Sequence, residues 1–399
     1  MHATASAFDS DPVKLALLSC VEAAIGIQAN SGAAWATGAF DQLLKRNDAF
    51  RSAVDSFSSD QEISPRLGRP FMCVMGGVSE LRAEEVISNF VRCCIRDADG
   101  HSFAKEQFDI LFEKFMLSLR KGQVRLTVSA GIEHCWSDVG EFSIGDYQLI
   151  MQQGSIGYRP YKLTRIESVR YLEQTEETSL EKSRNLQDEI RAETAVVLDL
   201  IRLITRRSLS APQLKIEFET PSGGRGGSTL VFSPCDEWLS NAHLRLANID
   251  PLRRFTASLA QAERSTRMAL RRFGLSRCEF DQDEKIFHLM SASEALFLSG
   301  EQTESANKLA LRGAFFLGQD PNSRRAIFNV LKTAYGVRSS IAHGDSADKK
   351  KRIGLDGARI DKYAFAELID NLVAAAILVA LCIGTPKPDW ESLIIGDLK

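Results

Sequence analysis

Residues 323–344, SRRAIFNVLKTAYGVRSSIAHG, are the stretch that decides the fold of the C-terminal part of the chain. Apolar residues recur along it at helical spacing, and Gly344 follows as a residue type that commonly ends a helix. We therefore expect a helix over 323–342. Arg338 and His343 lie five residues apart near its C-terminal end, so the end of this helix is also the first place to look for chemistry.

The segments on both sides of this stretch have the same helical period. From about residue 240 onward the sequence gives no convincing strand, and the breaks between helical segments contain glycine or proline. Further helices are expected at 252–273, 285–298, 303–317 and 362–382, with a loop over 344–357. The sequence thus predicts an all-α helical bundle at 245–385 and a C-terminal tail at 386–399.

The first part of the chain, 1–240, has a mixed pattern. Helical spacing dominates 13–57, 81–95 and 103–119, whereas the stretch beginning at Val124 alternates as a strand does. Beyond it we expect a hairpin or meander over 142–166, a charged helix or linker over 173–193, an apolar helix over 195–204, and strands at 214–218 and 229–232. This pattern predicts an α+β region of unknown role. The glycine-rich stretch 223–227 is interpreted as a hairpin turn, because no Lys-Ser/Thr pair or helix follows it.

Composition limits the class of protein. The chain has 399 residues, which favours two domains, and its 44% apolar and 25% charged residues are typical of a globular protein. The net charge of −3 excludes a chain that is basic overall, so the total charge does not indicate a nucleic-acid-binding protein. Eight cysteines without a CxxC pair favour buried thiols in a reducing cytosol, so we expect a cytoplasmic protein. The longest uncharged apolar run, 372–383, is shorter than the ~18 residues of a membrane span, so no membrane partner is expected.

The pair Arg338 and His343 has a plausible joint chemistry. Five residues turn a helix by roughly 140°, so the two side chains share one broad side. An arginine supplies a permanently charged fork of donors for phosphate, and a histidine can exchange protons near neutral pH. No zinc-type set of four ligands, P-loop or dinucleotide-binding glycine pattern is present, so neither a metal nor a cofactor is expected.

The C-terminal third of the chain resembles the HEPN superfamily, and within it the Apea-like branch. The resemblance begins at Ser293-Glu294-Ala295-Leu296-Phe297-Leu298, continues through the segment around Arg312, and ends in Tyr335, Arg338, His343 and Gly344. It covers about 250–384. It implies an all-α HEPN-type bundle that carries an Arg-x4-His motif on a late helix. Members of this superfamily typically form a homodimer in which the two motifs share one cleft.

The resemblance also implies an activity, which is metal-independent endoribonuclease cleavage of RNA by attack of the 2′-hydroxyl on the neighbouring phosphate. His343 would transfer protons and Arg338 would stabilise the phosphoryl charge. Ser339 stands where many members have Asn, Asp or His. Supporting roles are expected for Ser339, Tyr335, Glu294 and Arg312, although the last two could instead form an interhelical ion pair. The basic run Lys349, Lys350, Lys351 and Arg352 could contact RNA phosphates or could simply be solvated.

Two alternatives remain open from the sequence. The helical domain could be a non-catalytic dimerisation, nucleotide-binding or RNA-binding module. The N-terminal region could carry the activity, but we find no catalytic set of residues there. For a ribonuclease of this kind the resemblance suggests a role in antiviral defence or as a toxin, with the N-terminal region acting as a sensor, a regulator or a substrate-positioning element.

Overall fold

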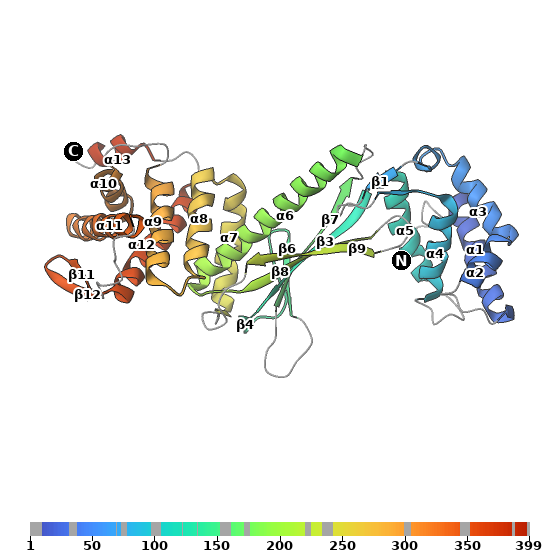
Figure 1. The fold of residues 1–399 in the computed structure, drawn as a ribbon, viewed down its shortest axis with the longest axis horizontal. Coiled ribbons are helices and arrows are strands. Elements are labelled where there is room, and N and C mark those ends of the chain that lie inside the picture. The colour runs from blue at the N-terminus through green and yellow to red at the C-terminus, as the bar shows by residue number, and fades with distance from the viewer. Residues whose placement is uncertain are drawn as a thin grey trace, which may run out of the picture. The chain divides into compact units, whose positions relative to one another are not determined.

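A computed structural model of the chain describes residues 10–31, 38–68, 70–72, 78–96, 105–121, 123–133, 135–151, 161–170, 176–219, 225–233, 242–298, 305–343, 352–384 and 388–396 (Figure 1). An α+β N-terminal region is followed by a predominantly helical C-terminal part, as the sequence predicts.

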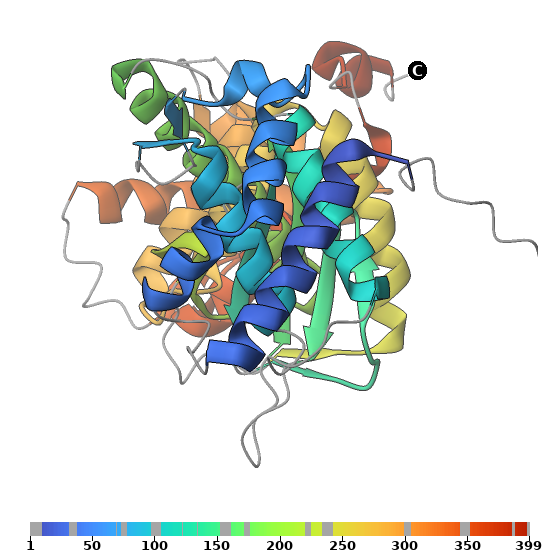
Figure 2. The same cartoon turned by 90° about the vertical axis from the view of Figure 1, so that its right-hand side faces the viewer.

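The N-terminal segment forms a helical cluster with its own apolar core (Figure 2). Its elements are α1 (Pro12–Ser31), α2 (Gly38–Lys45), α3 (Asp48–Ser59), the short 3-10 helix η1 (Ser64–Arg66), β1 (Pro70–Met72), β2 (Val78–Glu80), α4 (Ala83–Arg96) and α5 (Lys105–Lys121). Phe90 from α4 packs against Phe108 and Phe115 from α5. Arg120 Nη1 lies 2.6 Å from Asp11 Oδ2, and Arg120 Nη2 lies 2.6 Å from Asp60 Oδ2. These two ion pairs join the end of α5 to the segment that precedes α1 and to the segment that follows α3.

A six-stranded sheet follows, with the strand order β5-β6-β7-β3-β8-β9. Its strands are β3 (Gln123–Ile132), β5 (Phe142–Ile144), β6 (Tyr147–Met151), β7 (Tyr161–Arg170), β8 (Ala211–Glu219) and β9 (Arg225–Ser233). The expected meander over 142–166 is confirmed, because β5, β6 and β7 pair antiparallel in sequence order. Strands β8 and β9 are neighbours in the sheet; Gly223 and Gly224 of the expected turn between them lie outside the described residues.

Helix α6 (Glu176–Thr205) corrects one expectation, because the charged segment and the apolar segment form a single 30-residue helix. No glycine or proline interrupts this range, so nothing in the local sequence ends the helix where its composition changes. The apolar half supplies buried residues such as Leu198 and Ile201.

The chain divides into two compact units of interleaved segments, whereas the sequence suggested one boundary near 240–245. The first unit contains 1–128, 166–189 and 215–229, and the second contains 129–165, 190–214 and 230–399. The reason is that β3, β7, β8, β9 and α6 are long enough to contribute residues to both units.

The second unit contains a seven-helix C-terminal part. Its helices are α7 (Leu246–Gln261), α8 (Arg264–Ser276), α9 (Gln282–Phe297), α10 (Ser305–Leu317), α11 (Pro321–Ala342), α12 (Lys362–Ile383) and α13 (Trp390–Gly396). The expected helix over 252–273 is therefore two helices, which separate at Ala262 and Glu263 where the backbone is extended. Helix α13 lies in the expected tail.

The prediction of an all-α C-terminal part is wrong in one respect. β10 (Ala242–Leu244) pairs in parallel with β4 (Cys135–Ser137). β11 (Arg352–Leu355), inside the expected 344–357 loop, pairs antiparallel with β12 (Ala358–Asp361), which follows that loop. Asp356 and Gly357 both have positive φ, as a two-residue hairpin turn requires. The hairpin thus forms from strands of only four residues each.

Helix α12 is the central helix of this part. It buries Phe365, Ile369, Val373 and Ile377, and its buried Asp370 accepts hydrogen bonds from Arg206 and Arg277. By length and composition, this helix and Pro12–Asn30 are two candidate membrane spans, a test that core helices of soluble proteins also pass. The buried ion pairs of Asp370 and the helices packed around α12 favour a core helix.

Candidate functional site

Helix α11 positions the Arg338 and His343 motif. Asp320 caps the helix by accepting hydrogen bonds from the backbone of Asn322 (2.8 Å) and Ser323 (3.1 Å), and Pro321 occupies the first turn. The helix ends at Ala342, and His343 is the capping residue, with its N–H donating to Ser339 O at 3.1 Å. Gly344, expected to stop the helix, lies outside the described residues.

Arg338 is held by helix α9. Its Nη2 lies 3.4 Å from Oε2 of Glu294, and its guanidinium carbon lies 5.2 Å from the ring centre of Phe287. Phe287 and Glu294 are seven residues apart on α9, so both face the same side of that helix. The Arg338 side chain keeps 26% of its surface exposed. The guanidinium is therefore fixed in direction and still partly accessible.

Glu294 is a half-buried carboxylate whose main partner in this site is Arg338. Burial raises the pKa of the Glu294 carboxyl above its usual value, and the Arg338 guanidinium acts in the opposite direction. The structure thus brings together two of the expected site residues. Glu294 pairs with Arg338 on α11, whereas the sequence left open an ion pair between Glu294 and Arg312 on α10.

The other motif residues lie along the C-terminal turns of α11. His343 is exposed, while Tyr335 and Ser339 are half-buried. Tyr335 precedes Arg338 by three residues and so lies on the same side of the helix. An exposed imidazole at a helix end can reach a bound molecule without any rearrangement of the helix core.

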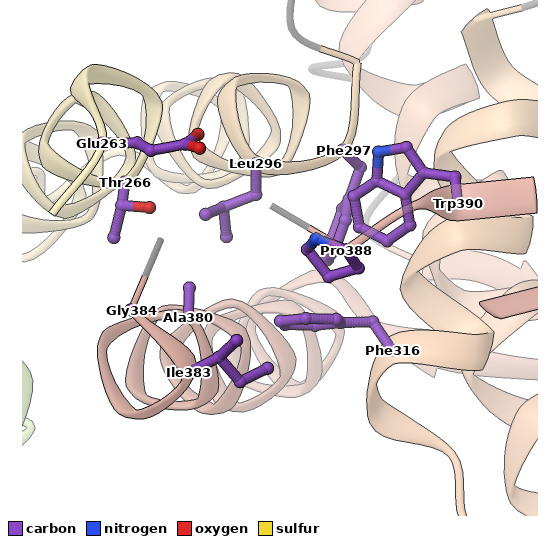
Figure 3. Close-up of a pocket in the computed structure, with 10 residues that line it drawn as sticks. All are labelled: Glu263, Thr266, Leu296, Phe297, Phe316, Ala380, Ile383, Gly384, Pro388 and Trp390. Carbon is purple, nitrogen blue, oxygen red and sulfur yellow. The ribbon is translucent and has the colours of Figure 1, made fainter. Parts of the chain in front are cut away.

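Arg312 belongs to a different cluster. Its Nη1 donates to Phe297 O at 2.7 Å, and its guanidinium carbon lies 5.4 Å from the Trp390 ring centre. Phe297, Phe316 and Trp390 contact one another edge-to-face and form one wall of an apolar pocket (Figure 3). Arg312 thus anchors α13 to the bundle.

The basic segment after the motif is described only at its end. Lys349, Lys350 and Lys351 lie outside the described residues, and Arg352 is exposed at the start of β11. The hairpin that follows is tied to α11, because Asn329 Nδ2 donates to Asp356 Oδ1 at 2.7 Å. Arg352 is therefore carried by a defined element beside the motif helix.

Comparisons with known protein families, with curated proteins and with solved structures found no match to this chain.

Phe287 is the site residue that the sequence interpretation missed. Its position seven residues before Glu294 was an available signal, since i and i+7 share a helix face.

Possible metal ligands are dispersed in the part of the chain that the structure describes, where no three His, Cys, Asp or Glu side chains gather.

The thiols differ in environment. Burial raises the pKa of Cys20 and of Cys135 to about 12, whereas Cys382, expected to be buried, is exposed near the end of α12. His134 and Cys235 lie outside the described residues.

Proposed function

We propose that this chain is an endoribonuclease of the HEPN type that acts without a metal ion. The observation that carries the proposal is the arrangement at the end of α11, where α9 fixes the guanidinium of Arg338 and the exposed imidazole of His343 follows five residues later. The family assignment itself rests on the sequence resemblance over about 250–384.

The proposed reaction is a transesterification within RNA. The 2′-oxygen forms a bond to phosphorus, the bond from phosphorus to the 5′-oxygen breaks, and the products are a 2′,3′-cyclic phosphate and a 5′-hydroxyl. A proton leaves the 2′-hydroxyl and a proton is given to the 5′-oxygen. His343 would serve these transfers, because an imidazole exchanges protons near neutral pH.

Arg338 would stabilise the negative charge that grows on the phosphoryl oxygens. Glu294 and Phe287 would act as positioning residues, because they restrict the guanidinium to one direction before RNA binds.

A homodimer would complete the site. Two copies of the α11 end, facing each other, would supply one imidazole on each side of the phosphate, so that one accepts a proton while the other donates one. The requirement for a 2′-hydroxyl would restrict the activity to RNA.

The test uses the purified full-length protein, RNA of mixed sequence and EDTA. The wild type should cleave, whereas His343→Ala and Arg338→Ala should lose at least about 100-fold of the rate, the usual contribution of one acid–base or charge-stabilising group. Arg325→Ala is the matched control, since Arg325 is exposed in the first turn of the same helix. Equal rates for wild type and His343→Ala would contradict the proposal.

The second candidate function is a non-catalytic RNA-binding or dimerisation module. The contact that favours it is the Glu294–Arg338 ion pair, because an arginine engaged in this way also serves to join α9 to α11. A module of this kind would bind RNA without cleaving it, and His343→Ala would leave its binding unchanged.

The wider setting follows from the resemblance and the thiols. We propose a cytoplasmic protein that acts in antiviral defence or as a toxin, with the N-terminal α+β region sensing a trigger, regulating the nuclease or positioning RNA. The free thiols of Cys20 and Cys135 fit a reducing compartment, where disulfides are rare.

A further inference from the structure

The β11–β12 hairpin has two chemically different faces. Cross-strand partners share a face, so the register Arg352↔Asp361 and Gly354↔Arg359 places these four residues on one side. The opposite face carries Ile353, which is buried, and Ile360. The side with Arg352 and Arg359 is therefore directed away from the apolar contacts of the hairpin.

The two arginines on this face are exposed and close together. They occupy diagonal positions on neighbouring strands, which places their Cβ atoms about 7–8 Å apart. Gly354 lies on the same face, and a Cβ added there would meet nothing within 4 Å. Among the described residues, no carboxylate lies within ion-pair distance of either guanidinium. The face thus presents two exposed guanidinium groups and one carboxylate, that of Asp361, which caps α12.

An exposed aromatic side chain follows the hairpin at the start of α12. Asp361 ends β12 and caps α12 by accepting a hydrogen bond from Tyr363 N at 2.8 Å. Tyr363, two residues beyond the strand, keeps 59% of its surface exposed. Lys285 Nζ lies 5.8 Å from its ring centre, but this ammonium is buried and paired with Glu367 at 2.9 Å, so the two arginines remain the cations available to a ligand. Guanidinium groups next to an exposed aromatic ring are the usual components of a surface that binds single-stranded nucleic acid.

The hairpin is rigidly attached beside the motif helix. Its turn is fixed to the middle of α11 by the 2.7 Å hydrogen bond from Asn329 to Asp356. Its first strand begins nine residues after His343. The hairpin therefore lies beside α11 and follows the motif closely in the sequence, with Arg359 next to the turn.

We propose that the exposed face of the β11–β12 hairpin, with Tyr363, binds single-stranded RNA beside the motif. Arg352 and Arg359 contact two phosphates of one strand, and a base stacks on the Tyr363 ring. This inference rests on the proposed function and specifies its substrate as unpaired RNA, because a base held inside a duplex cannot stack on the ring.

The test measures binding of a fluorescent single-stranded oligoribonucleotide to the full-length protein, with His343→Ala in every sample to prevent cleavage. Replacing Arg352 and Arg359 together by alanine should weaken binding by about tenfold at 50 mM salt. The salt slope, which is the steepness with which the logarithm of the binding constant falls with the logarithm of the salt concentration, should decrease by about 1.4, the value for two phosphate contacts on a single strand. Replacing both by lysine should largely preserve the slope. Arg264→Ala, an exposed arginine at the start of α8, is the control and should change neither quantity.

Tyr363 has a different expected signature. Tyr363→Ala should weaken binding at least about fivefold without changing the salt slope, and Tyr363→Phe should bind as the parent does, because stacking needs only the ring. A duplex of the same sequence should bind more weakly than the single strand and should not respond to Tyr363→Ala.

The outcomes separate the two proposals. If the wild type cleaves RNA but the hairpin and Tyr363 variants bind as tightly as the parent, the inference about this face is wrong and the proposed function stands. If the variants lose binding as expected while the wild type does not cleave, the face is a binding surface of a non-catalytic module. If the parent protein binds no RNA and the wild type cleaves none, both proposals fail.

Discussion

Arg338 on α11 and Glu294 on α9 form an ion pair of 3.4 Å between two half-buried side chains. The pair joins the helix that carries the motif to α9, which lies two helices earlier in the sequence. It also fixes the direction of the guanidinium that we propose for charge stabilisation. The same ion pair therefore contributes to the stability of the fold and orients a group of the proposed site.

The first prediction concerns this pair. Arg338→Ala removes the charge that opposes the effect of burial, so the pKa of Glu294 rises further and its ionised form becomes more costly in the folded state. We expect a loss of about 1–2 kcal/mol in unfolding free energy at pH 7, between the values for exposed and buried pairs. Below the usual glutamate pKa, near pH 4, the carboxyl is protonated in both states and most of this loss should disappear.

Urea unfolding at pH 7 and pH 4 measures this difference. Adding Glu294→Gln to Arg338→Ala should restore stability at pH 7. A loss of equal size at both pH values would show that Arg338 contributes through packing on Phe287 rather than through its charge.

The second prediction concerns Asp370 on α12. Its buried carboxylate accepts hydrogen bonds from Arg206 and Arg277, so Asp370→Asn leaves two partly buried guanidinium groups without their common anion. We expect a loss of about 3 kcal/mol in unfolding free energy. Denaturant titration tests this, with the exposed Glu391→Gln as the control. A loss below about 0.5 kcal/mol would mean that water replaces the carboxylate.

The third prediction compares two helical glycines. A Cβ on Gly274 in α8 would lie 1.9 Å from Oδ1 of the buried Asp199, which pairs with Arg202 and Arg271, whereas a Cβ on Gly336 in α11 would meet nothing within 4 Å. Gly274→Ala should therefore destabilise the protein by about 3 kcal/mol. Gly336→Ala should stabilise it by about 0.5–1 kcal/mol, because alanine is the better helix former. Thermal unfolding of both variants gives the comparison, and a neutral Gly274→Ala would contradict the packing around Asp199.

The fourth prediction concerns thiol reactivity. At pH 8 the thiolate of Cys20 and of Cys135 is scarce, because burial raises the pKa of each to about 12, while Cys382 is exposed. Iodoacetamide should modify Cys382 well before the other two in the native protein, as peptide mass spectrometry would show. Equal labelling of Cys20 and Cys382 would indicate that the N-terminal helical cluster opens readily.

The helices that could be predicted well are those with clear apolar spacing and clear ends. The expected 323–342 and 362–382 match α11 and α12 within two residues, because Pro321 lies at the start of one helix and Gly384 follows the other. The sequence predicts two segments in place of α6, because the residues change from mostly charged to mostly apolar along it. Both halves nevertheless favour a helical backbone, so they form one helix. The β11–β12 hairpin was missed although Asp356-Gly357 is a typical hairpin turn, since its strands are short and follow a run of lysines.

The site could be predicted only in part, for a physical reason. Spacing along one helix placed Arg338 and His343 at the same end of α11, because that relationship is local. The partner of Glu294 depends on how α9 packs against α10 and α11, and no local pattern determines that packing. The same holds for Arg312, whose contacts with Phe297 and Trp390 depend on the position of α13.

The most direct test of the proposed chemistry is the structure of the RNA ends. Full-length protein with EDTA and an RNA of one defined sequence should produce 2′,3′-cyclic phosphate and 5′-hydroxyl ends, and a single 2′-deoxy substitution should abolish cleavage at the linkage that follows it. The His343→Ala variant, in the same oligomeric state as the wild type, should produce neither type of RNA end. Cleavage that continues at the 2′-deoxy position, or equally in His343→Ala, would contradict attack by the 2′-hydroxyl assisted by His343.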